Sequence, residues 1–366
     1  MRIMNKILLS ANAVLCLFTP IILCAQQKQV PKLKMEQIYQ EVKTPFKYGL
    51  VLVPNSKGEM VDSPSIFSYN DLWYMIYLVY DGKGYETWIA KSDDLLQWKT
   101  MGKILSFSSN TWDSNQKAGY IALQNYDWGG KYDVEKYKGK FWMSYLGGAS
   151  QGYEAGMLGV GIANTEKLVE VAEWKRFKNP VLLPTDSNAR WYDNGKIYKS
   201  TIIEDKERTL NHRFVMFYNA ENKPETNNRN EKAERIAMAV SDDMQDWRRL
   251  GEQPVIDHHS GISGDAYITK IGDLWVMFYF GAFWKPKAFD RFACSYDLIN
   301  WTDWEGEDLI SPSESYDNLY AHKPFVIKTK GIVYHYYCAV NDKNQRSIAV
   351  ATSVDLGKSK LKFPEN

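Results

Sequence analysis

The sequence predicts an all-β protein, a five-bladed β-propeller preceded by a short N-terminal helical arm. Three observations predict this fold. Aromatic strands recur along the chain at intervals of 58 to 73 residues, each is followed by a strand of small or apolar residues, and a turn then follows. Self-similar units of strands favour a radial repeat, because an isolated antiparallel sheet cannot bury both of its faces.

The aromatic strands align on one position in each unit. They read LWYMIYLVY, KFWMSYL, RFVMFYN, LWVMFYF and IVYHYYC, and the aligned residues are Met75, Met143, Met216, Met277 and His335. In three units a Ser-x-Asp turn follows, and a tryptophan stands six residues after its serine. We expect Trp98, Trp247 and Trp301 to pack between neighbouring blades.

The segments outside the repeat divide the chain into three parts. Residues 1–25 have a basic start, an apolar middle and a small residue before a polar stretch, which is the pattern of a secretory signal peptide. Residues 26–49 form the arm, with a short helix expected over Met35–Val42, and residues 50–360 form the propeller. The prediction is therefore an exported protein, periplasmic or extracellular, with no membrane span. The alternative is a lipoprotein modified at Cys24, although Leu23 stands where such signals carry a small residue.

Composition limits the partners and the chemistry. Lys and Arg number 45 against 44 Asp and Glu, so the formal charge is +1, and we expect no nucleic acid partner. After cleavage only Cys294 and Cys338 remain, and we expect buried free thiols rather than a disulfide. The oligomeric state stays open.

Ionisable residues stand at equivalent strand starts in three units. Asp62, Asp265 and His322 precede their aligned residues by 13, 12 and 13 positions. Since the innermost strands of a propeller start at the mouth of its central channel, we expect the three side chains to converge. Each residue alone is also explained as a turn-capping aspartate or a hydrogen-bonded histidine. In the third unit the register is open, and Asp193, Lys199 or Glu204 could fall at this position.

The strand starts VDSPSIF, GISGDAYI and YAHKPFV and the Ser-x-Asp turns resemble the five-bladed propeller glycoside hydrolases of families 43, 32, 62, 117 and 130. Family 43 implies a glutamate acid, but the fourth unit carries Asp265. The Asp, Asp, His pattern is most similar to family 117. The resemblance implies an exo-acting, inverting glycosidase with Asp62 as general base and His322 or Asp265 as acid.

Aromatic and polar residues outside the aligned strands are the candidates for sugar binding. Their alternative role is loop anchoring. The predicted substrate contacts are Trp128, Asp133, Arg190, Trp191, Glu204, His259 and Trp284. Lys323 is given no role, because a regular strand would turn it away from His322.

The resemblance leaves several alternatives. A family 130-type phosphorylase needs a basic cluster for phosphate, and a non-catalytic carbohydrate-binding propeller needs only the aromatic residues. No cofactor or protein metal ligand is expected. Related propellers hold a calcium or sodium ion in the channel, but no dense acidic loop of the kind that a calcium cage needs is visible.

Overall fold

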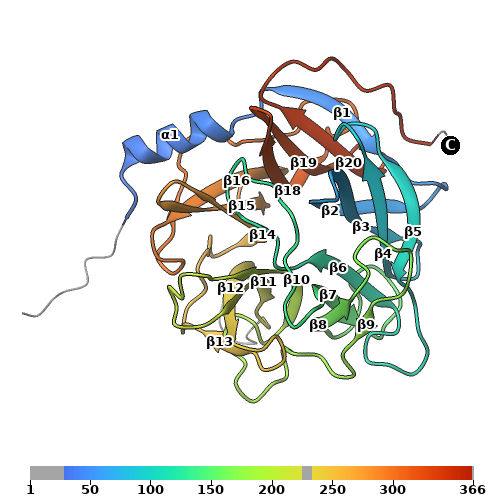
Figure 1. Cartoon of the computed structure of the whole chain (residues 1–366), viewed down its shortest axis with the longest axis vertical. Coiled ribbons are helices and arrows are strands. Elements are labelled where there is room, and N and C mark those ends of the chain that lie inside the picture. Colours follow the sequence, from blue (N-terminus) through green and yellow to red (C-terminus); the bar gives the residue numbers. More distant parts are fainter. Residues whose placement is uncertain (1–28, 225–232, 365–366) are drawn as a thin grey trace, which may run out of the picture.

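The computed structural model describes residues 29–224 and 233–364. The predicted signal peptide and Cys24 lie outside these residues. Within them the chain is built almost entirely of β-strands, which are arranged in a ring around a common centre (Figure 1). The prediction of an all-β protein is confirmed.

The strands form antiparallel units of consecutive strands, and parallel bridges from β4 to β6 and from β12 to β14 join the first four units in pairs. The first two units are β2 (Met60–Tyr69), β3 (Leu72–Tyr80), β4 (Tyr85–Ser92) and β5 (Lys99–Leu105), then β6 (Gln116–Ile121), β7 (Phe141–Gly148), β8 (Leu158–Thr165) and β9 (Lys175–Arg176). The next two are β10 (Lys196–Glu204), β11 (Phe214–Glu221), β12 (Ala233–Ser241) and β13 (Arg248–Leu250), then β14 (Gly261–Ile271), β15 (Leu274–Ala282), β16 (Ala288–Ser295) and β17 (Thr302–Asp303). The last sheet contains β18 (Tyr320–Thr329), β19 (Ile332–Val340), β20 (Arg346–Thr352) and β1 (Phe46–Leu52).

The N-terminal arm contains the expected helix, but it also contributes a strand. Helix α1 (Lys32–Val42) buries Met35, Ile38 and Val42 against the core. Strand β1 begins at Phe46, inside the predicted arm, and pairs with β20. The boundary at residue 50 differs because β20 would otherwise present an unpaired edge, which β1 covers.

The alignment of the aromatic strands corresponds to a common register. Each aligned residue pairs with a β-branched residue on the preceding strand of its unit, and all five aligned side chains except that of His335 are methionines; all five are 0 % exposed. The pairs are Ile66–Met75, Ile121–Met143, Ile202–Met216, Ile268–Met277 and Val326–His335.

The predicted packing of the tryptophans between units is confirmed. Trp98 makes an edge contact with Tyr336 on β19, and Trp301 makes one with Phe217 on β11. Trp247 packs on a buried cluster drawn from β7, β8, β10 and β11. Each indole N–H donates to the carbonyl oxygen of the residue three positions before it, which fixes the ring against its turn.

Bulges interrupt the first strands of four units near the centre of the ring. The register shifts between Asp62 and Ser65 on β2, between Gly264 and Tyr267 on β14, and between His322 and Phe325 on β18. A similar shift lies on β10. A bulge breaks the alternation of a strand and re-aims its side chains. Consecutive residues can therefore face the same side.

Two further expectations concern cysteines and the membrane. Cys294 and Cys338 are buried free thiols, as predicted. In the part of the chain that the structure describes, no helix is long and apolar enough to cross a membrane.

Candidate active site

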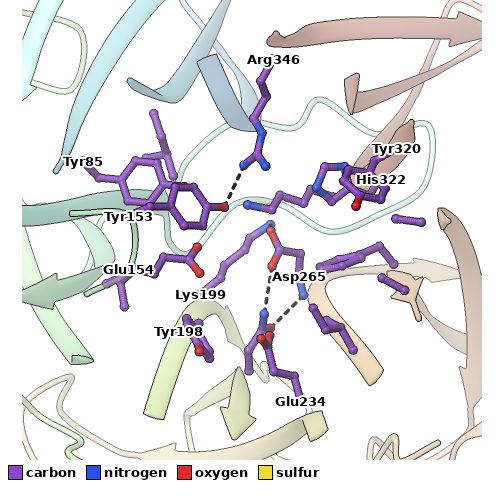
Figure 2. A pocket seen from close by; sticks show the side chains of 18 of the residues that line it. Tyr85, Tyr153, Glu154, Tyr198, Lys199, Glu234, Asp265, Tyr320, His322 and Arg346 are labelled. Carbon is purple, nitrogen blue, oxygen red and sulfur yellow. Dashed lines mark hydrogen bonds and ion pairs between the residues drawn. The ribbon is translucent and has the colours of Figure 1, made fainter. Parts of the chain in front are cut away.

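A cavity of about 240 Å³ opens where the first strands of the units meet (Figure 2). Aromatic and ionisable side chains from several units line it, among them Tyr85, Tyr120, Tyr153, Glu154, Tyr198, Lys199, Glu234, Asp265, Tyr320, His322, Lys323 and Arg346. A small concave site with convergent polar groups is the expected form of an active site.

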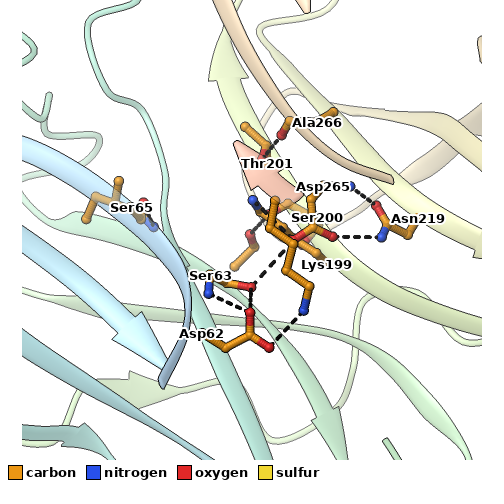
Figure 3. A network of polar contacts seen from close by, with 12 residues as sticks. Asp62, Ser63, Ser65, Lys199, Ser200, Thr201, Asn219, Asp265 and Ala266 are labelled. Atoms are coloured by element: carbon orange, nitrogen blue, oxygen red, sulfur yellow. Dashed lines mark hydrogen bonds and ion pairs between the residues drawn. The ribbon is translucent and has the colours of Figure 1, made fainter. Parts of the chain in front are cut away.

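The three residues predicted to converge do so. Asp265 and His322 line the cavity, and Asp62 lies directly behind it with no exposed surface. Ser63 connects the two aspartates, because its Oγ lies 3.3 Å from Asp62 Oδ1 and 3.5 Å from Asp265 Oδ2 (Figure 3). The geometry of the prediction is therefore present, whereas the catalytic roles of the three residues stay predictions.

Asp62 is held by cations. Its Oδ2 accepts hydrogen bonds from Lys323 Nζ at 2.9 Å, Arg346 Nη1 at 2.5 Å and Tyr85 Oη at 3.2 Å. Burial by itself would raise the pKa of this carboxyl, but Lys323 and Arg346 lower the pKa well below its usual value. Asp62 is thus ionised and fully paired, an arrangement that suits a charge anchor.

Asp265 is positioned by its backbone and by Asn219. Its φ of 56° lies in the left-handed region, and its N–H donates to Asn219 Oδ1 at 2.8 Å. Asn219 Nδ2 donates back to Asp265 Oδ1 at 3.0 Å, while Lys199 Nζ lies 3.7 Å from Oδ2. Lys199 is therefore the residue of the third unit that reaches the site.

His322 is neutral at neutral pH. Its Nδ1 lies 3.1 Å from the carbonyl oxygen of Cys338, so Nδ1 carries the proton and Nε2 keeps its lone pair. Burial, followed by the charges of Arg346 and Lys323, lowers its pKa to about 3. A neutral imidazole of this kind has little capacity to donate a proton, so the geometry gives no support to His322 as the acid.

Two glutamates in the cavity were not found from the sequence. Glu154 lies in the loop between β7 and β8, and Glu234 is the second residue of β12. Burial, together with the charges of Glu154 and Glu221, raises the pKa of Glu234 well above 4.5. Burial also raises the pKa of Glu154, although Lys323 opposes this effect. Both carboxyls face the cavity (Figure 2).

Lys323 also enters the site, contrary to the expectation that it points away. Its φ of 64° at the bulge replaces the regular alternation, so Lys323 and His322 line the same cavity. Arg346, the first residue of β20, comes from the other end of the last sheet and donates to Tyr153 Oη at 2.9 Å. No strand pattern marks either residue in the sequence.

The residues predicted to contact substrate lie outside the cavity lining, which includes none of them. Trp128 Nε1 donates to Glu41 Oε1 of α1 at 2.7 Å, so this ring anchors the arm. Asp133 is exposed, and Glu204 forms an ion pair with Arg213 at 2.7 Å.

The other predicted contacts are also occupied elsewhere. Arg190 forms an ion pair with Glu252 at 2.9 Å, and Trp191 donates to the carbonyl oxygen of the same glutamate. The side chain of His259 is 87 % exposed. Trp284 stands behind the cavity wall, where it stacks on His258 with ring centroids 3.9 Å apart.

Known structures decide the family. No protein-family profile and no curated protein matches the chain. A solved structure described as "Glycoside hydrolase" is 48 % identical, with a TM-score of 0.89, and the match covers 92 % of this chain and 99 % of that one. The chain is a glycoside hydrolase. A second structure, described as a complex of BT0996 and RGII, is 49 % identical with the same TM-score and coverage.

This glycoside hydrolase shares its fold with more distant enzymes. Zg3597, a family 117 glycoside hydrolase of the marine bacterium Zobellia galactanivorans, is 15 % identical with a TM-score of 0.59 over 86 % of this chain and 93 % of its own. A thermostable family-43 enzyme is 13 % identical with a TM-score of 0.60, over 86 % of this chain and 99 % of its own. The predicted resemblance to propeller glycoside hydrolases is confirmed, and the substrate is a carbohydrate.

The donor set of the glycoside hydrolase site does not fit a calcium ion. Among the described residues, no three His, Cys, Asp or Glu side chains are grouped as metal ligands. The oxygen atoms of Asp62 and Asp265 instead face Lys323, Arg346 and Lys199. Calcium prefers six to eight oxygen ligands, whereas these carboxylates already have cationic partners.

Proposed function

We propose that this glycoside hydrolase removes a terminal sugar with Glu234 as general acid and Glu154 as general base. The observation that carries the proposal is the presence of two glutamates with raised pKa values in one small cavity. Glycoside hydrolysis needs one carboxylic acid to protonate the leaving oxygen and one carboxylate to activate water or attack carbon.

Glu234 is the better proton donor of the two. The pKa of Glu234 is raised well above 4.5, first by burial and then by its carboxylate neighbours, so it holds a proton near neutral pH. Its O–H would donate to the glycosidic oxygen as the bond from that oxygen to the anomeric carbon breaks.

Glu154 is the better base. Lys323 and Arg346 oppose the rise in its pKa and so favour its ionised form. Lys196 Nζ donates to the backbone carbonyl of Glu154 at 2.9 Å and so holds this part of the loop. Its carboxylate would take a proton from the water that attacks the anomeric carbon, which gives an inverting reaction.

Asp62 and Asp265 then serve as anchors rather than as base and acid. Asp62 fixes Lys323 and Arg346, and Asp265 faces Lys199. The three cations keep the acid environment of the cavity from raising the pKa of Glu154 as far as that of Glu234. This assignment replaces the roles that the resemblance to family 117 implies.

The size of the cavity supports exo action on a small sugar unit. At about 240 Å³ it lies below the ~300–1,000 Å³ of typical sites for drug-sized ligands. RGII, which is named with the 49 % identical relative, supplies the first candidate substrate, an oligosaccharide prepared from it.

The finer fold and the location are also part of the proposal. The four units and the closing sheet correspond to five blades, with β1 and β20 closing the ring. The sequence of residues 1–25 supports export, to the periplasm or beyond, and the donor set supports catalysis without an ion or cofactor.

Phosphorolysis is the second candidate, because Lys199, Lys323 and Arg346 line the cavity and could receive phosphate. Their pairing with Asp62 and Asp265 favours hydrolysis. The test incubates the enzyme with an RGII oligosaccharide in buffer with and without inorganic phosphate. Hydrolysis predicts release of a free terminal sugar at the same rate in both buffers. Formation of a sugar phosphate only when phosphate is added would favour the phosphorylase, and absence of any product would overturn the substrate.

A further inference from the structure

An aromatic residue at the cavity wall is both exposed and conformationally strained. Phe283 follows β15, lines the cavity and is 62 % exposed. Its φ of 67° lies in the left-handed region, where a bulky side chain is rare. Folding gains little from an exposed ring and loses free energy to the strain. Such strain is retained chiefly at functional sites.

The surrounding hairpin holds this conformation firmly. The N–H of Phe283 donates to the carbonyl oxygen of Lys287 at 3.3 Å, and Trp284 Nε1 donates to the carbonyl oxygen of Ile262 at 2.9 Å. Gly261 lies directly beneath, where a Cβ would approach the carbonyl oxygen of Ala282 to 2.3 Å. The close approach therefore requires a glycine at this position.

The ring of Phe283 is continuous with the wall of the site. It makes an edge contact with Tyr320, with ring centroids 6.0 Å apart, and Tyr320 in turn lies 5.9 Å from the ring of His322. The path from the inner cavity to solvent on this side thus runs along aromatic rings. Because Phe283 is largely exposed, its free face lies at the outer end of this path.

We propose that Phe283 is the platform for the second sugar of the substrate, the one that carries the glycosidic oxygen. The apolar face of a sugar ring would stack on Phe283 while the terminal sugar occupies the inner cavity. This inference rests on the proposed exo action, and it adds that the preferred substrates are oligosaccharides whose second residue presents an apolar face. Trp284, which the sequence singled out, supports the platform from behind.

The test compares two substrates in wild-type enzyme and in Phe283→Asn, Phe283→Trp and Leu33→Ala. The substrates are the RGII oligosaccharide and the 4-nitrophenyl glycoside of the sugar that it releases. Asparagine tolerates the left-handed backbone, so Phe283→Asn should fold and should unfold at a higher temperature than the wild type. Leu33 is a matched control because it is 67 % exposed and lies on α1.

We expect Phe283→Asn to raise the KM for the oligosaccharide by about five- to tenfold while kcat changes little. The 4-nitrophenyl glycoside should show a much smaller change, Phe283→Trp should restore the oligosaccharide KM, and Leu33→Ala should match the wild type. An unchanged oligosaccharide KM, or equal changes on both substrates, would overturn the platform. A changed oligomeric state in Phe283→Asn with an unchanged KM would instead assign the ring to a contact between two copies of the protein.

Failure of the proposed function is distinguishable from failure of the platform. If the wild type hydrolyses neither substrate, the proposed function fails. Binding of the same oligosaccharide by titration calorimetry then decides the platform. A dissociation constant weakened about five- to tenfold in Phe283→Asn supports it, and equal affinities overturn it.

Discussion

Arg346 Nη1 lies 2.5 Å from Asp62 Oδ2, although 284 positions of the chain separate the two residues. Arg346 begins β20, the strand that pairs with β1, and Asp62 lies on β2. One ion pair at the centre of the ring therefore ties the last sheet to the first unit, close to the glutamates that we assign to catalysis.

The first prediction concerns the charge of Asp62. Asp62→Asn leaves the buried Lys323 and Arg346 without their anion, and we expect a loss of about 3–5 kcal/mol in the free energy of unfolding. Denaturant unfolding at pH 7 measures this loss.

Asp290→Asn is the matched control. Asp290 is also 0 % exposed, but burial raises its pKa well above 3.8, so it is protonated and its O–H donates to His335 Nε2 at 2.9 Å. An asparagine amide can donate the same bond, and the change should cost less than about 1 kcal/mol. Equal losses in both variants would show that Asp62 has no special role as an anchor.

The second prediction concerns stability in acid. The pKa of Asp62 is lowered in the folded protein from an unfolded value of about 3.9. Its contribution is therefore fully present above about pH 3.9 and is lost as the pH falls through the lower folded value. The difference in unfolding free energy between wild type and Asp62→Asn should shrink as the pH is lowered through this range. A difference that stays constant down to pH 2 would contradict the lowered pKa.

The third prediction concerns the pH dependence of kcat/KM. Glu154 must be ionised and Glu234 protonated, and both pKa values are raised, that of Glu234 the more strongly. We expect a bell-shaped profile whose acid limb belongs to Glu154 and whose alkaline limb belongs to Glu234. The residual activity of Glu234→Gln should lose the alkaline limb and keep the acid one. A profile of unchanged shape in this variant would exclude Glu234 as the group that titrates.

Much of the fold could be predicted from the sequence because the repeat is written in buried residues. Met75, Met143, Met216 and Met277 face the core in the same register, so their spacing identified the units. The same alignment located Asp62, Asp265 and His322. The residues that the spacing aligned are the ones that the ring brings together.

The rest of the site depends on features that the spacing does not encode. Lys323 enters the cavity through a bulge, and Glu154 comes from an irregular loop with a φ of 47°. Glu234 follows a polar stretch that read as a solvated excursion, although β12 already begins at Ala233. The predicted aromatic contacts failed to reach the cavity because tryptophans such as Trp128 and Trp284 anchor the arm and the hairpin instead.

The most direct measurement of the central claim is the dependence of kcat/KM on the leaving group in Glu234→Gln and Glu154→Gln. A 2,4-dinitrophenyl glycoside departs without protonation, whereas an oligosaccharide does not. If Glu234 is the acid and Glu154 the base, Glu234→Gln should lose about 10²–10⁴-fold on the oligosaccharide and little on the dinitrophenyl glycoside, while Glu154→Gln should lose activity on both. Near wild-type activity of both variants on the oligosaccharide would contradict the account.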